Sequence, residues 1–485
     1  MKRKKFFRKL YLLLIVIFIT ITIPTSTNVQ AIENNSEANT NLIILFNNNI
    51  DNNVEKFIRK SGGKIVNNFP DIGGLEVKCN PKLIPNIKAF NEVKSVAPNH
   101  PINIPKEKII DFKDYIKKNK TLNKIYNNNE DVDLYNTYQW DIKRVTNNGE
   151  SFKLNSGNHN VVIGVIDSGI KKDHPDLKKN FMGGENFVSK GFNDDETETG
   201  NSNDIEDRFG HGTYVAGNIA ANGKVKGVAP NIGFKSYRVF DSKKTTNASI
   251  VSSAIIKATN DGVDIINLSM AGYDLNGKCY WTDPDTGVKY DLGDDMAEYE
   301  LYKRAIKYAI DHNVIVVTAA GNDGLDCGDP KKLTKLLNDI NSKYGFKYEG
   351  LTYVVPATID GVINVSATGT TDEISSYSNY GKGYIDITAP GGDYPDLCFN
   401  TGASDSGYVF GEGTSIAAPK VAAIAGLILC ENPNLKPKEV EKRIYKTCDK
   451  LYDNKFNEYY GAGLANAYTA LIEGKESKTS VKNYK

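Results

Sequence analysis

The sequence predicts an α/β protein built on a doubly wound parallel sheet, preceded by a small α+β domain. From Gln139 onward, buried apolar segments alternate with helical ones, an order that implies a parallel sheet with helices on both faces. Residues 41–104 instead follow the order βαββαβ. The composition, 40% apolar and 25% charged over 485 residues, is that of a globular chain with one large core and a smaller domain.

Five segments are predicted to be the buried strands of the large sheet. These segments are Val161–Asp167, Phe234–Phe240, Val263–Ser269, Val314–Ala320 and Val362–Ala367. Helices are expected near residues 211–221, 248–260, 298–312, 415–430 and 437–448. Two long polar stretches between these elements, Tyr273–Asp295 and Asp323–Gly350, are expected to be surface insertions.

The domain boundaries follow from changes in composition. Residues 32–104 form the small domain, and residues 105–133 are rich in Lys and Asn, which predicts an exposed, cleavable linker. The large domain spans residues 134–472. The polar residues 473–485 are expected to be a disordered tail.

The N-terminus predicts export. Six Lys and Arg residues lie within the first nine positions, an apolar run follows from Leu10 to Ile23, and small side chains stand at Val29 and Ala31. This is the pattern of a secretory signal peptide over residues 1–31. The alternative is an uncut membrane anchor, for which the apolar run is short. We expect a secreted, extracellular or cell-surface protein that meets a membrane only through this segment.

The charge balance excludes one class of partner. The chain has 60 Lys and Arg against 59 Asp and Glu, so it lacks the basic surplus of a nucleic-acid-binding protein. Residues 32–130 are slightly basic and residues 131–485 are acidic, which predicts electrostatic pairing between the two parts.

Four polar residues occupy the places where parallel sheets gather functional groups. Asp167 ends a predicted strand, Asn322 follows another, and His211 and Ser415 each open a helix. Each has a structural alternative as a turn residue or a helix cap. Together, an acid, an imidazole, an amide and a hydroxyl form the constellation of nucleophilic acyl transfer.

The segments around these residues resemble a known family. Asp167-Ser168-Gly169, His211–Gly217 and Gly413–Pro419 are similar, in this order, to the three signatures of subtilisin-like serine proteases. Gly227–Pro230 and Asn267–Met270 fill the positions between them, and the resemblance covers about residues 139–470.

The resemblance implies a role for each residue. Ser415 would be the nucleophile, His211 its general base and then general acid, and Asp167 the group that orients the imidazole. Asn322 would donate its side-chain amide to the oxyanion. Residues 32–104 are similar to inhibitory propeptides of the family, which implies a zymogen whose own propeptide is an intramolecular inhibitor.

The resemblance also outlines a cleft for an extended peptide or protein substrate. One side would be the loop at Lys243–Asn247. The other side and the pocket wall would be formed by two short segments: Ser269, Met270, Ala271 and Gly272, and Ala319, Ala320 and Gly321. Beyond that wall lie three acids, Asp323, Asp326 and Asp329, which either select Arg or Lys or simply solvate an insertion.

A narrower resemblance concerns the substrate. Tyr138–Ile142, with the signal, the linker and an acidic large domain, is similar to lantibiotic leader peptidases, which implies removal of a leader from an exported peptide precursor. No Arg occurs between Lys60 and Lys143, so self-cleavage is expected after Lys or another residue. The candidate lysines are Lys117, Lys118, Lys120 and Lys124. The alternatives are a broad-specificity extracellular degradative protease and an inactive, peptide-binding fold.

No cofactor is expected for the chemistry. Asp176 matches a calcium ligand of the family, which implies a structural calcium ion. The loop Ala221–Gly227 is short beside the family's calcium loop.

Overall fold

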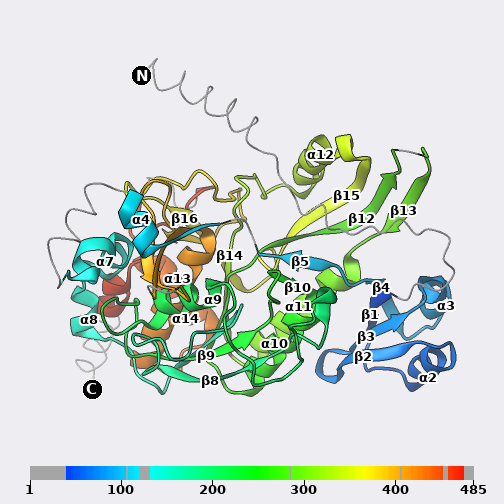
Figure 1. Cartoon of the computed structure of the whole chain (residues 1–485), viewed down its shortest axis with the longest axis horizontal. Coiled ribbons are helices and arrows are strands. Elements are labelled where there is room, and N and C mark those ends of the chain that lie inside the picture. Colours follow the sequence, from blue (N-terminus) through cyan, green and yellow to red (C-terminus); the bar gives the residue numbers. More distant parts are fainter. Residues whose placement is uncertain are drawn as a thin grey trace, which may run out of the picture.

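A parallel sheet of seven strands forms the centre of the large domain (Figure 1). The computed structural model describes residues 40–104, 107–118, 132–284, 286–404, 407–451 and 457–473. The strand order is β17-β16-β14-β11-β7-β9-β8, and every neighbouring pair is parallel. Their bounds are β7 (Val162–Asp167), β8 (Phe181–Asn186), β9 (Gly233–Arg238), β11 (Ile265–Leu268), β14 (Ile315–Ala319), β16 (Val362–Thr368) and β17 (Ile387–Pro390). The doubly wound parallel sheet is confirmed.

Helices cover both faces of this sheet, because successive side chains of a buried strand point to opposite sides. Ile265 packs in the core with helices α9 (His211–Ala220) and α13 (Thr414–Glu431). Ile266 packs in the core with α10 (Ala248–Asn260) and α11 (Met296–Asp311). Helix α14 (Pro437–Thr447) packs on α13.

Helix α13 is buried along almost its whole length. Every residue from Thr414 to Leu429 is buried. Within the described residues, α13 is the one helix long and apolar enough to cross a membrane, and 89% of its apolar window is buried inside the protein. Its hydropathy is therefore explained by its place between the sheet and α14.

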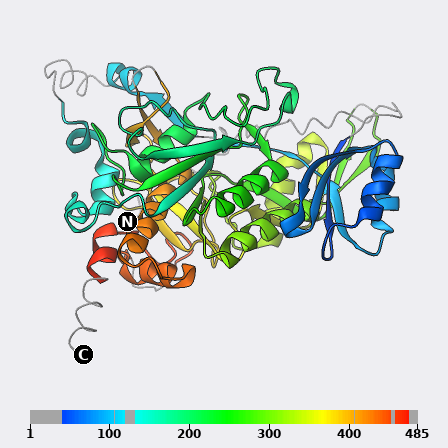
Figure 2. The ribbon, with the colours of Figure 1, turned by 90° about the horizontal axis from the view of Figure 1, so that it is seen from below.

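The N-terminal domain has the predicted βαββαβ order and lies at one end of the molecule (Figure 2). Its antiparallel sheet has the order β2-β3-β1-β4. The bounds are β1 (Thr40–Phe46), α2 (Asn52–Lys60), β2 (Lys64–Phe69), β3 (Gly74–Cys79), α3 (Ile84–Lys88) and β4 (Val93–Pro98). On β1, Leu42 and Ile44 face the domain's own helices, whereas Ile43 and Leu45 pack in the core of α10 and α11.

The segment after this domain differs from its prediction as an exposed linker. Strand β5 (Pro101–Asn103) lies at the end of the predicted small domain, and the predicted linker forms β6 (Lys108–Asp111) and α4 (Phe112–Lys118). Phe112 is 3% exposed and Ile116 is 2% exposed, and both pack in the core of the large domain. Two apolar side chains four residues apart on one helix turn are enough to anchor it. The rest of the predicted linker up to residue 131 lies outside the described residues, except for residue 107.

The two predicted insertions are also ordered. Together they form an antiparallel sheet of order β13-β12-β15 with a helix beside it. The bounds are β12 (Gly272–Thr282), β13 (Lys289–Gly293), α12 (Pro330–Asn341) and β15 (Phe346–Val355). The predicted signal peptide, and the predicted tail beyond residue 473, lie outside the described residues.

Arg304 on α11 joins the two domains, and its removal should loosen them. The guanidinium donates to the backbone oxygens of Phe46, Ile72 and Gly73 at 2.7, 2.8 and 3.1 Å. Arg304→Met should lower the free energy of unfolding of the full-length Ser415→Ala protein by about 2 kcal/mol, because three carbonyls lose a charged donor. Denaturant titration measures this. Lys307→Met, on the same helix but paired only with Asp311, is the control and should change it by less than about 0.5 kcal/mol.

Candidate active site

Asp167 and His211 form the first contact of the site. Asp167 ends β7 and His211 begins α9. His211 Nδ1 lies 2.6 Å from Asp167 Oδ1, and both side chains are almost completely buried. A carboxylate at this place fixes the orientation of the imidazole and leaves its Nε2 atom facing the open side of the sheet.

Asp207, which the sequence did not identify, holds this pair in place. Its Oδ1 accepts hydrogen bonds from Ser168 Oγ and Gly210 N at 2.8 Å, and its Oδ2 accepts from Thr213 N. Ser168 Oγ in turn accepts from Gly212 N at 2.8 Å. A Cβ atom on Gly212 would stand 2.3 Å from the backbone oxygen of Gly169, so only glycine allows this approach. The start of α9 is thus tied to the end of β7.

Asn322 and Ser415 meet at the start of α13. The Asn322 Oδ1 atom accepts hydrogen bonds from Thr414 N at 2.9 Å and Thr414 Oγ1 at 2.8 Å. This fixes the side-chain amide so that its Nδ2 atom points away from Thr414 and toward the site. The backbone oxygen of Ser415 accepts from Ser269 Oγ at 2.8 Å. The structure therefore brings together all four predicted residues: Asp167, His211, Asn322 and Ser415.

Between them lies the carboxylate of Glu107, which the sequence analysis did not single out. It accepts a hydrogen bond from Ser415 Oγ and one from Asn322 Nδ2 at 3.3 Å, and it lies 3.1 Å from His211 Nε2. The Glu107 side chain is 3% exposed. The only sequence signal is weak, because Glu107 is the one acid between Glu92 and Asp111.

The two carboxylates control the charge of His211. Burial disfavours the charged imidazolium, but the negative charges of Asp167 and Glu107 outweigh burial and hold the pKa of His211 well above its ordinary value. The two carboxylates therefore favour the protonated form of His211. A protonated imidazole cannot accept a proton from Ser415.

The chain around Glu107 runs through the predicted cleft. Strand β5 pairs antiparallel with β10 (Thr245–Asn247), and Ile104 N donates to the Lys244 oxygen at 3.1 Å. On the other side of the site, β6 pairs antiparallel with β19 (Tyr408–Glu412). The predicted cleft side at Lys243–Asn247 thus holds an extended segment.

The opposite predicted side of the cleft also touches this segment. A Cβ atom on Gly272 would lie 3.5 Å from Ile102 Cγ2. Met270 is buried, and Ala271 is partly buried beside the core that contains Ala320. The pocket-wall residues Ala319 and Ala320 are buried, and Gly321 has a left-handed φ of 99°.

The three acids beyond the wall have different partners. Asp323 accepts from Tyr273 Oη at 2.5 Å. Asp326 pairs with Lys332. Asp329 caps helix α12 through the backbone N–H groups of residues 331 and 332. Asp326 and Asp329 therefore stabilise the insertion that contains α12, and selection of Arg or Lys would depend on Asp323.

Asp176 does not fit the expected calcium site. Its Oδ2 atom accepts from Val225 N and Tyr408 Oη, both at 3.1 Å. Gln139 holds the same loop through the backbone N and O of Lys226 at 2.7 and 2.8 Å. N–H and O–H donors face the Asp176 carboxylate, where a calcium ion would require further oxygen ligands. Direct hydrogen bonds within the protein thus hold the short loop.

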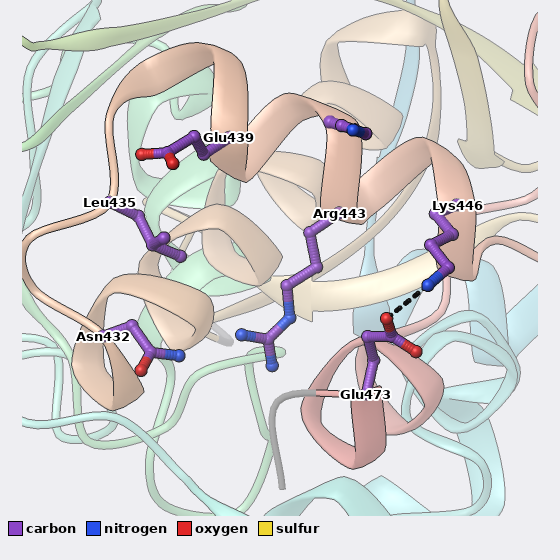
Figure 3. A pocket seen from close by; sticks show the side chains of 7 residues that line it. Asn432, Leu435, Glu439, Arg443, Lys446 and Glu473 are labelled. Atoms are coloured by element: carbon purple, nitrogen blue, oxygen red, sulfur yellow. Dashed lines mark hydrogen bonds and ion pairs between the residues drawn. The ribbon is translucent and has the colours of Figure 1, made fainter. Parts of the chain in front are cut away.

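A pocket elsewhere holds no part of this site. It lies beside α14 and is lined by Asn432, Leu435, Glu439, Lys442, Arg443, Lys446 and Glu473 (Figure 3). Arg443 pairs with Glu431 at 2.8 Å, and Lys446 pairs with Glu473 at 2.5 Å. These ion pairs join α14 to its neighbours.

The fold and the site define a serine endopeptidase of the subtilase type. The model of the subtilase family, Peptidase_S8, matches residues 158–463, and the chain belongs to this family. It is similar to proteases that process lantibiotic leader peptides.

The similarity to these proteases extends over most of the chain. The epidermin leader peptide-processing serine protease EpiP of Staphylococcus epidermidis is 33% identical over 446 residues, which cover 86% of this chain and 90% of EpiP. The nisin leader peptide-processing serine protease NisP of Lactococcus lactis is 36% identical over 334 residues, 64% of this chain and 46% of NisP. A crystal structure of EpiP from Staphylococcus aureus has a TM-score of 0.73 and 30% identity, and covers 89% of this chain and 98% of that one.

Removal of calcium should not destabilise the protein, because protein donors hold Asp176. Addition of a chelator should change the Tm of the full-length Ser415→Ala protein by less than about 1 °C relative to excess calcium chloride. Thermal unfolding followed by circular dichroism checks this. A Tm that falls steeply on chelation would contradict the assignment of these hydrogen bonds.

Proposed function

We propose that the protein is a secreted zymogen that cuts its own precursor and then removes the leader of an exported, lantibiotic-type peptide precursor. The observation that carries this is the place of residues 101–104 and 107–111 in the cleft, with Glu107 against Ser415 and His211. The named relatives EpiP and NisP support the leader-processing part. The basic, then apolar N-terminus supports export to the extracellular space or cell surface.

In the proposed mechanism, Ser415 Oγ attacks the carbonyl carbon of the scissile peptide bond. His211 Nε2 takes the proton of Ser415 and then gives it to the leaving amine, while Asp167 orients and stabilises the imidazolium. Water then hydrolyses the acyl-enzyme through the same groups. No cofactor takes part in these steps.

The developing oxyanion would be stabilised by Asn322. Its Nδ2 atom is aimed at the site because Thr414 occupies its oxygen. The Ser415 backbone N–H and the positive end of α13 add to this field. In the precursor, the carboxylate of Glu107 occupies the place where these donors would meet the oxyanion.

The proposed self-cleavage lies upstream of the four candidate lysines named from the sequence. Lys117 and Lys118 lie in α4, which packs on the large domain, so their peptide bonds are helical and not extended in the cleft. Lys120 and Lys124 lie outside the described residues. The segment that crosses the site runs between the two paired strands, so we place the cut between Ile104 and Lys108.

Cleavage of peptides by the processed enzyme tests the proposed activity. A leader-processing enzyme should cut a diverse peptide library at one narrow motif, and Ser415→Ala should lower kcat by about 10⁶. Asn322→Ala should lower kcat by about 10²–10³ with little change in KM, because its amide acts on the oxyanion. Mass spectrometry of the products measures both.

The pattern of cuts separates the alternatives. Scattered, Ser415-dependent cuts would support a broad-specificity degradative protease and contradict leader processing. Cuts that do not depend on Ser415 would contradict the assigned mechanism, and the absence of any cut would support an inactive, peptide-binding fold. Cuts concentrated after Arg or Lys that disappear in Asp323→Asn would support the acidic pocket.

The pH dependence of self-processing should depend on Glu107. His211 acts as a base only when neutral, so self-processing increases as the pH rises through the pKa of His211. Glu107 raises the pKa of His211. The ion pair between Glu107 and the imidazolium therefore forms at a pH below this pKa and is lost at a pH above it. Glu107→Gln removes the charge, so the pH profile should shift toward acid.

Gel analysis of the precursor over a pH series measures this shift. Glu92→Gln, an exposed acid of the N-terminal domain, is the control and should leave the profile in place. An unchanged profile in Glu107→Gln would show that the carboxylate does not govern the charge of His211.

A further inference from the structure

Two carboxylates of the large domain contact His100, which precedes β5, and a third acts on it through its charge. His100 N donates to Glu298 Oε1 at 2.6 Å, and His100 Nδ1 lies 2.8 Å from Glu298 Oε2 and 3.4 Å from Asp295 Oδ1. Asp274 on β12 completes the set, since its charge acts on His100, Asp295 and Glu298. Asp295 and Glu298 lie at the start of α11, which contacts β12.

The cluster lacks a cation from its own domain. Glu298 is 3% exposed and Asp274 is 6% exposed. Within the described part of the chain, no Lys or Arg pairs with any of the three acids, and Asp274 Oδ2 is buried without a hydrogen-bond partner. Burial and mutual repulsion raise the pKa of Asp274 and of Glu298, and a buried carboxylate is stable when a cation faces it.

In the precursor, His100 supplies that cation. Burial disfavours its charged form, but the carboxylates of Glu298, Asp295 and Asp274 outweigh burial and raise its pKa to about 9. The backbone N–H of His100 also donates to Glu298, so the carboxylate faces two hydrogen-bond donors of one residue. These distances are those of charged hydrogen bonds, and the N–H would repel a metal ion at the same oxygen.

His100 lies directly before the strand that fills the cleft. Asn103 of β5 pairs with Thr245 of β10, and His100 is three residues upstream of Asn103 (Figure 1). A substrate peptide that pairs antiparallel with β10, as β5 does, places the residue three positions upstream of the one opposite Thr245 where His100 now lies. The carboxylates remain on the large domain when the prosegment has left.

We propose that Asp274, Asp295 and Glu298 form an acidic subsite that binds a Lys or Arg side chain of the substrate, three residues upstream of the residue that pairs with Thr245. This rests on the proposed function, because it requires that the prosegment leaves and that a peptide substrate takes its place on β10. The substrate class is therefore a peptide with a basic residue well upstream of the bond that is cut.

The test scans one Lys through the upstream positions of a quenched fluorescent peptide that the processed enzyme cuts. Norleucine at the same position is the neutral control of similar length. Lys should raise kcat/KM about tenfold over norleucine at one upstream position, mainly through KM, because a charged hydrogen-bonded pair is formed on binding. Glu at that position should lower kcat/KM.

Variants assign the effect to the subsite. In Asp295→Asn/Glu298→Gln, the ratio of kcat/KM between the Lys and norleucine peptides should fall to about one. Glu300→Gln, on the same helix and paired with Lys94, is the matched control and should keep the ratio. A ratio of one at every upstream position of the wild-type enzyme, or a ratio that the double variant retains, would overturn the subsite while cleavage itself supports the protease activity.

A second measurement does not depend on catalysis. In the full-length Ser415→Ala protein, His100→Lys should keep a Tm near that of the parent, whereas His100→Met should lower it and His100→Glu should lower it most. The reverse order, with Met more stable than Lys, would overturn the subsite even if no peptide were cut.

Discussion

The contact of the Glu107 carboxylate with Ser415, His211 and Asn322 is the interaction on which the state of this molecule depends. One buried negative charge meets three groups that a serine protease needs for its chemistry. It accepts hydrogen bonds from the Ser415 hydroxyl and the Asn322 amide, and with Asp167 it raises the pKa of the His211 imidazole. Ser415, His211 and Asn322, which would act on the carbonyl group of a substrate, thus bind the Glu107 carboxylate of the segment that covers the site.

The flanking residues make this contact possible by fixing the chain on both sides of Glu107. Upstream, β5 pairs with β10 and His100 lies on its carboxylates. Downstream, β6 pairs with β19, and Phe112 is buried in the core of the large domain. Arg304 ties the N-terminal domain to α11. A carboxylate held at both ends loses little further entropy when it enters the site.

The sequence predicted the strands, helices and motifs that can be read from neighbouring residues. It missed contacts that depend on pairing between segments far apart in the chain. The segment 161–166, which contains most of β7 and reads Val-Val-Ile-Gly-Val-Ile, is a continuous apolar run, so such strands of the sheet were predictable. Asp167, His211, Asn322 and Ser415 stand in short, Gly-rich motifs at strand and helix ends. Glu107 has no such motif, because its place is set by strand pairs with residues 245–247 and 408–412. The anchoring of α4 was hidden in a Lys- and Asn-rich segment for the same reason.

The N-terminus of the processed enzyme tests the central claim most directly. The precursor and its Ser415→Ala variant would be incubated alone, and the new N-terminus determined by mass spectrometry. The account predicts a terminus between residues 105 and 108 in the wild type and none in Ser415→Ala. A terminus at residues 118–125, or the same terminus in both proteins, would show that the segment in the cleft is not the one that the enzyme cuts.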